Sequence, residues 1–131
     1  IKMIPQERQL LEEDIVGYFF LGEFHEQNGD IDKGIEMFET AALRAPQYPI
    51  PHVNLGIIYQ KYHRLEEAKV TFLAALEVDE TLINARYRLA AVQAETGDFA
   101  DAILNLEYVI KQDPDYQEAA RHLEQLRKMA R

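Results

Sequence analysis

The sequence predicts an all-α fold, a solenoid of antiparallel helix pairs, and two observations carry this prediction. The first is an internal repeat without insertions: the pair Leu21-Gly22 returns as Leu55-Gly56 and again as Leu89-Ala90, each time 34 residues further on. The second is the spacing of apolar residues at steps of three and four, which is typical of amphipathic helices. A repeat of this length indicates stacked supersecondary units.

The remainder of each unit repeats at the same spacing. A small residue, a large apolar residue and a further small or β-branched residue follow the first pair in order: Gly34, Phe38 and Ala41, then Ala68, Phe72 and Ala75, then Ala102, Leu106 and Val109. Pro46 and Pro114 close the first and third units. Each unit therefore consists of two predicted helices, and with a final helix the predicted starts are near residues 6–15, 31, 51, 65, 83, 99 and 116.

The N-terminal residues 1–14 have two interpretations. Pro5 could open an extended first helix that runs to about Gln27, because proline is tolerated in a first turn. Alternatively, these residues form a separate extension before the first repeat. We expect the apolar residues Ile1, Met3 and Ile4 to pack on something outside the sequence, and a chain that begins with isoleucine is expected to be a fragment.

Glycine and aspartate mark the turn inside the first and third units. Gly29 and Gly97 stand where a left-handed residue ends a helix, and Asp30 and Asp98 follow where a side chain can cap the next one. The second unit has His63 at the glycine position, so we expect His63 to be a turn residue rather than a catalyst.

The third and fourth helices show the two helix types most clearly. Pro51 falls where the third helix should begin, and its apolar residues are dense enough for burial on more than one side: Val53, Leu55, Ile57, Ile58 and Tyr59. The fourth is amphipathic, with Leu65, Ala68, Phe72, Ala75 and Leu76 on one face. The last helix, with Ala120, Leu123 and Leu126, is predicted to cover the exposed end of the stack.

Glycine inside a helix costs about 1 kcal/mol relative to alanine. Close packing of the two helices in a unit would offset this cost. We therefore predict that Gly22 faces Gly34 and that Gly56 faces Ala68, with Ala90 in the same role in the third unit.

The composition excludes several classes of protein. A net charge of −9 argues against nucleic-acid binding, which requires clustered basic residues. The charge is uneven, because residues 1–48 carry a net −6 and residues 117–131 a net +2. No apolar run approaches the ~18 residues that a membrane-spanning helix needs. The absence of cysteine excludes disulfides and thiolate sites, and it suits the cytoplasm without establishing that compartment.

The residues also lack a set of catalytic groups. The sequence has no serine, no glycine-rich phosphate loop and no second histidine at the spacing of a zinc-protease helix after His25. His52 and His63 lie eleven positions apart without carboxylates in a ligand pattern. We therefore expect a non-catalytic protein without a metal or small-molecule cofactor.

The repeat resembles the tetratricopeptide repeat family, whose signature has Leu-Gly, Tyr, Ala, Phe, Ala and Pro over 34 residues. The second unit matches it at Leu55, Gly56, Tyr59, Ala68, Phe72 and Ala75. The tryptophan position departs from the pattern, with Tyr18, His52 and Arg86. The resemblance implies a right-handed superhelix with repeats at 15–48, 49–82 and 83–116 and a capping helix at 117–131.

The resemblance further implies a protein–protein interaction module that binds a peptide in a concave groove lined by the first helix of each repeat. Transferred to this sequence, the groove residues are Phe19, Phe20, Glu23, Val53, Asn54, Ile57, Asn84, Tyr87, Arg88 and Ala91, with Arg121 and His122 from the capping helix. We expect the apolar floor to consist of Phe19, Phe20, Val53, Ile57 and Tyr87. The alternative function is a self-associating scaffold that uses the exposed ends of the stack.

One known activity of the family does not fit. Its co-chaperone members clamp the acidic C-terminal tail of heat-shock chaperones with lysine, arginine and asparagine side chains. Asn54 and Arg88 match that pattern, whereas Phe19, Glu23 and Asn84 depart from it, and Glu23 would repel a carboxylate. We expect instead a mostly apolar partner segment with an acidic group toward the third repeat and a basic or neutral group toward the first.

Overall fold

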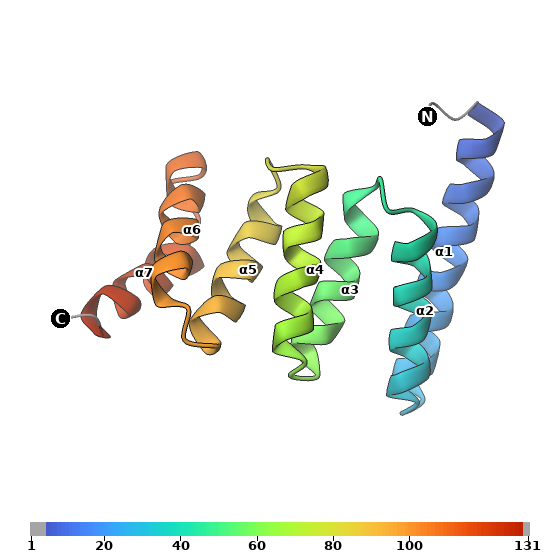
Figure 1. Ribbon diagram of the computed structural model, residues 1–131, viewed down its shortest axis with the longest axis horizontal. Helices are drawn as coiled ribbons and strands as arrows, with labels where there is room; N and C mark the ends of the chain where they lie inside the picture. The colour runs from blue at the N-terminus through green and yellow to red at the C-terminus, as the bar shows by residue number, and fades with distance from the viewer. Residues whose placement is uncertain (1–4, 130–131) are drawn as a thin grey trace.

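The computed structural model describes the backbone of residues 5–129 and the side chains of residues 13–129, and this part of the chain is an α-helical solenoid without strands (Figure 1). Ile1, Met3 and Ile4 lie outside the described residues. The helices are α1 (Pro5–Gln27), α2 (Ile31–Arg44), α3 (Pro49–Lys61), α4 (Leu65–Val78), α5 (Ile83–Glu95), α6 (Phe99–Gln112) and α7 (Gln117–Met129). The predicted all-α solenoid is confirmed, and α1 does extend back to Pro5.

The helices form two rows. Each helix packs against the next one in the chain, and the two ends of the chain lie at opposite ends of the array (Figure 1). The first helices α3 and α5 also contact each other, more extensively than any pair of the second helices α2, α4 and α6 does. We call the side of the first helices the inner surface and the side of the second helices the outer surface, where hollows lie between α2 and α4 and between α4 and α6.

Three clusters of buried residues run through the described stack, and the smallest joins Ile15 of α1 to Ala41 and Ala45 at the end of α2. The largest one extends from α2 to α5 and includes the fully buried Phe72, Leu89 and Val92. The remaining one joins α5, α6 and α7. As predicted, α7 covers the end of the last pair, with Leu123 and Leu126 buried; Ala119 completes this face, however, while the predicted Ala120 is exposed. Ala119 lies one helical turn before Leu123, and Ala120 is rotated away by one residue. No helix in the described chain is long and apolar enough to cross a membrane.

The turns within the pairs share one geometry. Gly29, His63 and Gly97 have positive φ values of 84°, 59° and 88°. In each turn the amide of the next residue donates to a carbonyl five residues back, as Arg64 N does to Tyr59 O at 2.8 Å. The prediction of a left-handed residue at these positions, His63 included, is confirmed.

The prediction for Asp30 and Asp98 is wrong in one respect. Both residues precede the next helix, but neither side chain bonds to the backbone there. The Asp98 carboxylate instead accepts a hydrogen bond from Lys69 Nζ at 2.7 Å, which links α4 to the start of α6. This contact and a hydrogen bond from Thr96 lower the pKa of Asp98.

Two helical glycines, Gly22 and Gly56, lie so close to a phenylalanine ring of the next helix that a side chain would not fit there. A Cβ atom on Gly56 would lie 2.6 Å from Cε1 of Phe72, and one on Gly22 would lie 2.7 Å from Cε2 of Phe38. The atoms nearest to this position on Gly56 thus belong to the ring of Phe72, which the sequence analysis did not name as its neighbour. The prediction for Gly34 is confirmed, since its Cβ would lie 3.0 Å from the carbonyl oxygen of Gly22.

Candidate functional site

The inner surface of α1, α3, α5 and α7 carries three hollows, which together we call the inner groove. The first, of about 390 Å³, is apolar and is lined by Ile15, Val16, Phe19, Tyr48, Pro49, Ile50 and Pro51. The second, of about 260 Å³, is lined by Phe19, Glu23, Glu26, Phe38, Asn54, Ile57, Ile58 and Lys61. The third, of about 340 Å³, is lined by Tyr87, Glu118, Arg121, His122 and Gln125.

Phe19 belongs to both hollows at the α1 end. Its ring stacks on that of Phe38 with centroids 6.0 Å apart and planes 28° apart. One face of the half-buried Phe19 side chain is thus held by the core, while the remainder borders the groove. Ile57 on α3 is also half-buried and completes an apolar floor across the two helices.

A salt bridge crosses the second hollow. Lys61 Nζ lies 2.7 Å from Glu26 Oε1, and this hydrogen bond raises the pKa of Lys61. The pair neutralises Glu26, one of the two carboxylates that line this hollow. The exposed Glu23 remains beside Asn54, which can both donate and accept hydrogen bonds.

An aromatic cluster forms the α5–α7 end of the groove. The Tyr87 ring lies 5.1 Å from Tyr116 and 6.2 Å edge-on from His122, measured between centroids. Burial raises the pKa of Tyr87, Glu118 acts in the same direction, and Arg121 and Arg88 oppose them. The Tyr87 hydroxyl therefore stays protonated at neutral pH, next to two guanidinium groups. The Nε–H of Arg88 is buried and finds no acceptor among the described residues.

The structure brings most of the predicted groove residues into these hollows. Phe19, Glu23, Asn54 and Ile57 meet in the second hollow, and Tyr87, Arg121 and His122 meet in the third. Asn84 is exposed and Ala91 half-buried on α5, where neither lines a hollow.

Two predicted floor residues are placed differently. Val53 is only 8% exposed and belongs to the main core, because neighbouring helices flank α3 on both sides. Phe20 is 69% exposed but lines none of the three hollows. Leu21 and Phe24, close to Phe20 at helical spacing, are also exposed, because no helix precedes α1 in the described stack. Val53 thus lies in the core, and Phe20 lies on the exposed face of α1 outside the three hollows.

Sequence reasoning missed Tyr48 and Tyr116. Tyr48 lines the first hollow, and Tyr116 packs against Tyr87 in the third. The two tyrosines are related by two repeat lengths, and each follows the closing proline of its unit by two positions. That equivalence was the signal that could have identified them.

Comparisons with known proteins agree with this architecture. Two family models, each described as tetratricopeptide repeat, match residues 16–48 and 84–116, together about half of the chain. Sperm-associated antigen 1 of Rattus norvegicus is 33% identical over 73 residues, which are 56% of this chain and 8% of that protein. The chain thus spans a small fraction of this relative's length.

Two solved structures illustrate the shared fold. The first TPR of Spaghetti (RPAP3) bound to the HSP90 peptide SRMEEVD has a TM-score of 0.82 at 17% identity, covering 90% of this chain and 94% of that chain. The second TPR domain of human RPAP3 in complex with the HSP70 peptide SGPTIEEVD has a TM-score of 0.80 at 18% identity, covering 89% and 98%. Identities this low show a common fold and leave the ligand open.

Proposed function

Because the chain belongs to the tetratricopeptide repeat family, we propose that it is a protein–protein interaction module that binds an extended peptide segment of a partner in the inner groove. The proposal rests on one observation: apolar hollows and an aromatic cluster with basic neighbours lie on the same surface of the stack. Apolar side chains, Phe19 and Ile57, border the hollows at the α1 end, and an aromatic cluster with basic neighbours borders the hollow at the α7 end. Structural neighbours with this fold carry bound peptides.

The side chains of the groove define the ligand class. Burial of one large apolar side chain against Phe19 and Ile57 contributes about 1.5–3 kcal/mol. Asn54 can hold a peptide backbone in both donor and acceptor roles. Arg121 lines the hollow at the other end, and Arg88 lies outside that lining but close enough to lower the pKa of Tyr87. These two positive charges, against the single carboxylate of Glu118, favour a carboxylate of the ligand at this end. The ligand is therefore an apolar segment with one acidic group directed toward α5 and α7.

This class differs from the peptides of the two structural neighbours. Both SRMEEVD and SGPTIEEVD end in a run with three acidic side chains. In this chain the exposed Glu23 borders the second hollow, and a like charge beside it costs binding energy. A ligand with a single acidic group at the α7 end avoids that repulsion.

The test is a pair of groove variants, Ile57→Asp and Arg88→Glu, each checked for helix content by circular dichroism. The probes are a labelled extended peptide with two leucines and one C-terminal aspartate, and the heptapeptide SRMEEVD. We expect the first probe to bind with higher affinity than the second and each variant to weaken it by about tenfold or more. Val70→Asp on the exposed outer side of α4 is the matched control and should leave binding unchanged.

If both groove variants bind the leucine probe as tightly as the parent does, the inner groove is not the peptide site. If SRMEEVD binds more tightly than the leucine probe, and if Glu23→Asn does not increase the affinity for SRMEEVD, the proposed ligand class is wrong. The inner groove would then remain the peptide site.

A second function, self-association, is favoured by the open face of α1. Leu21 is 47% exposed, whereas Leu55 and Leu89 at the equivalent positions are buried against the preceding pair. Phe20 and Phe24 extend this exposed apolar face. Sedimentation velocity at several concentrations tests it: a dimer that Phe24→Lys dissociates supports association through α1, and a monomer at all concentrations excludes it.

A further inference from the structure

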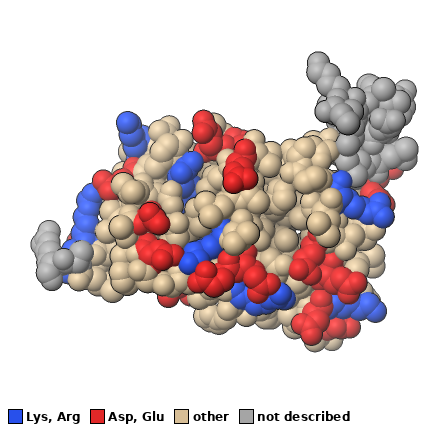
Figure 2. Space-filling model, viewed as in Figure 1, with Lys and Arg blue, Asp and Glu red and all other residues tan. Residues whose placement is uncertain are grey.

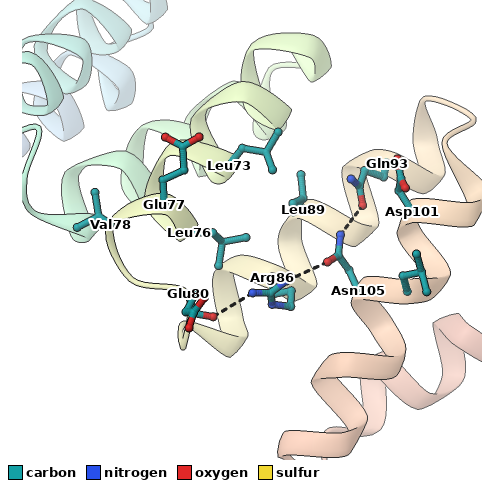
Figure 3. A pocket seen from close by; sticks show the side chains of 11 residues that line it. Leu73, Leu76, Glu77, Val78, Glu80, Arg86, Leu89, Gln93, Asp101 and Asn105 are labelled. Atoms are coloured by element: carbon teal, nitrogen blue, oxygen red, sulfur yellow. Dashed lines mark hydrogen bonds between the residues drawn. The ribbon is translucent and has the colours of Figure 1, made fainter.

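A further hollow lies on the outer surface, on the side of the second helices. It has a volume of about 830 Å³ and lies between α4 and α6, with α5 as its floor (Figure 3). We call it the outer groove and define it by Leu73 and Leu104 on its walls and by Arg86, Gln93 and Asn105 on its floor.

An equivalent hollow one repeat earlier is smaller. It lies between α2 and α4, has a volume of about 460 Å³, and includes Val70 where the outer groove has Leu104. In that hollow the buried Tyr59 donates from its hydroxyl to Glu39 Oε2 at 2.6 Å and so bridges α3 and α2. Gln93 and Leu73 stand at the corresponding positions of the outer groove. Gln93 is shorter than Tyr59, and Leu73 cannot accept a hydrogen bond as Glu39 does. The hydrogen bond that crosses the smaller hollow therefore has no counterpart between these two positions of the outer groove.

The polar side chains on the floor are engaged with one another. Asn105 Nδ2 donates to Gln93 Oε1 at 2.8 Å, and Arg86 donates to Asn105 Oδ1 at 3.2 Å and to the Glu80 carbonyl oxygen at 3.0 Å (Figure 3). The Arg86 guanidinium also stacks over the Tyr108 ring, with its carbon 4.1 Å from the centroid. This network holds the floor in one arrangement, and the charge of Arg86 is directed into it rather than toward the rim.

The walls of the outer groove are apolar and its rim is acidic, whereas its floor is polar. Leu104 is 65% exposed and Leu73 is 47% exposed, so both offer apolar surface to a partner. Glu77, Glu80 and Asp101 line the rim as exposed carboxylates, and none forms an ion pair within the described part of the chain. Figure 2 shows acidic side chains spread over the visible face, with fewer basic ones among them. The groove thus joins apolar walls to an acidic rim.

We infer that the outer groove binds a basic amphipathic helix of a partner protein, with leucine-like residues against Leu73 and Leu104 and lysine or arginine beside Glu77 and Asp101. An extended segment is disfavoured, because the floor offers it few free groups: Gln93, Asn105 and both terminal nitrogens of Arg86 are already hydrogen-bonded, and only the buried Nε–H of Arg86 has no acceptor among the described residues. The backbone groups of an extended segment would therefore be buried there largely without partners. A helix satisfies its own backbone and presents an apolar face. The basic residues follow from charge complementarity with the rim.

The experiment uses a labelled amphipathic peptide with leucines on one helical face and lysines flanking them, titrated into the chain by fluorescence anisotropy. A peptide of the same composition, scrambled so that the leucines share no face, is the ligand control. The protein variant is Leu104→Lys, and the matched control is Val70→Lys, which adds the same charge at the equivalent exposed position one repeat earlier.

We expect Leu104→Lys to weaken binding by about tenfold or more and Val70→Lys to change it by less than about twofold. Gln93→Tyr, which restores the residue of the smaller hollow, should also weaken binding. Ile57→Asp should leave it unchanged, so the result is independent of the inner groove. Equal binding of the scrambled peptide, or equal loss from Leu104→Lys and Val70→Lys, would show general charge attraction and overturn the inference. A parent dimer that Leu104→Lys dissociates would also overturn it, because a second copy would then be the occupant.

Discussion

The contact between Gly56 and Phe72 predicts that a single added methyl group destabilises the protein. In Gly56→Ala the new Cβ would lie 2.6, 2.8 and 2.9 Å from three carbon atoms of the Phe72 ring, whereas carbon atoms in contact are about 3.5–4.0 Å apart. Phe72 is fully buried, so the ring has no free space into which it can turn. The helices must therefore move apart.

The magnitude follows from two opposing effects. Overpacking in a close-packed core costs about 1–3 kcal/mol. Replacing glycine by alanine inside a helix returns about 1 kcal/mol. We expect Gly56→Ala to lower the free energy of unfolding by about 1 kcal/mol, the middle of the net range of about 0–2 kcal/mol. Gly56→Leu should lower it by about 3 kcal/mol or more, since a larger side chain has no rotamer that avoids the ring.

Urea unfolding followed by far-ultraviolet circular dichroism measures both changes as shifts in the midpoint. The matched control is Gly17→Ala, because a Cβ on Gly17 in α1 meets nothing within 4 Å. This control should raise the stability by about 0.5–1 kcal/mol through helix propensity alone. Glycine-to-alanine substitution is thus expected to lower the free energy of unfolding at Gly56 and to raise it at Gly17.

The third repeat supplies a compensating pair for a double-mutant cycle. It has Ala90 and Leu106 where the second repeat has Gly56 and Phe72, and both are fully buried. Gly56→Ala combined with Phe72→Leu should be no less stable than Phe72→Leu alone, which gives a coupling energy of about 1 kcal/mol or more. If Gly56→Ala is as stable as the parent, or if the coupling is zero, the ring contact does not explain the glycine.

Two further changes test the turns and the buried tyrosine. His63→Gly should stabilise the chain by up to about 1 kcal/mol, because the positive φ of 59° strains a residue with a Cβ. Gly97→Ala, at a φ of 88°, should destabilise the chain by a similar amount for the same reason. Thermal melting measures both changes, and a shift of the melting temperature in the same direction for both variants would contradict this explanation. Burial, together with the hydrogen bond to Glu39, raises the pKa of Tyr59 above its ordinary value. The unfolded chain therefore loses this proton first, so the stability contribution is complete below about pH 10 and declines above it. Urea midpoints across that range should fall less steeply for Tyr59→Phe, and an unchanged slope would show that Tyr59 does not cause the decline.

The sequence by itself determined the number, order and approximate ends of the helices. These depend on local properties: apolar spacing at 3.6 residues per turn, glycine in left-handed turns and proline in first turns. The repeat then placed equivalent residues in equivalent environments, which is why the positive φ of His63 was predictable from Gly29 and Gly97. The choice of Asn54, Ile57 and Tyr87 as groove residues came instead from the resemblance to the tetratricopeptide repeat family, and each of them lines a hollow on the first helices.

Only the tertiary structure decided which side chain fills each space between helices. Helical spacing indicates that Gly56 faces a neighbour, but whether Ala68 or Phe72 meets it depends on how α4 is rotated against α3. Val53 and Phe19 occupy equivalent positions, yet Val53 is buried because helices flank α3 on both sides, while in the described stack α1 is flanked on one side only. The outer groove likewise depends on three helices at once, because side chains of α4, α5 and α6 line it together. Such features depend on contacts between residues distant in sequence, and local periodicity carries no information about them.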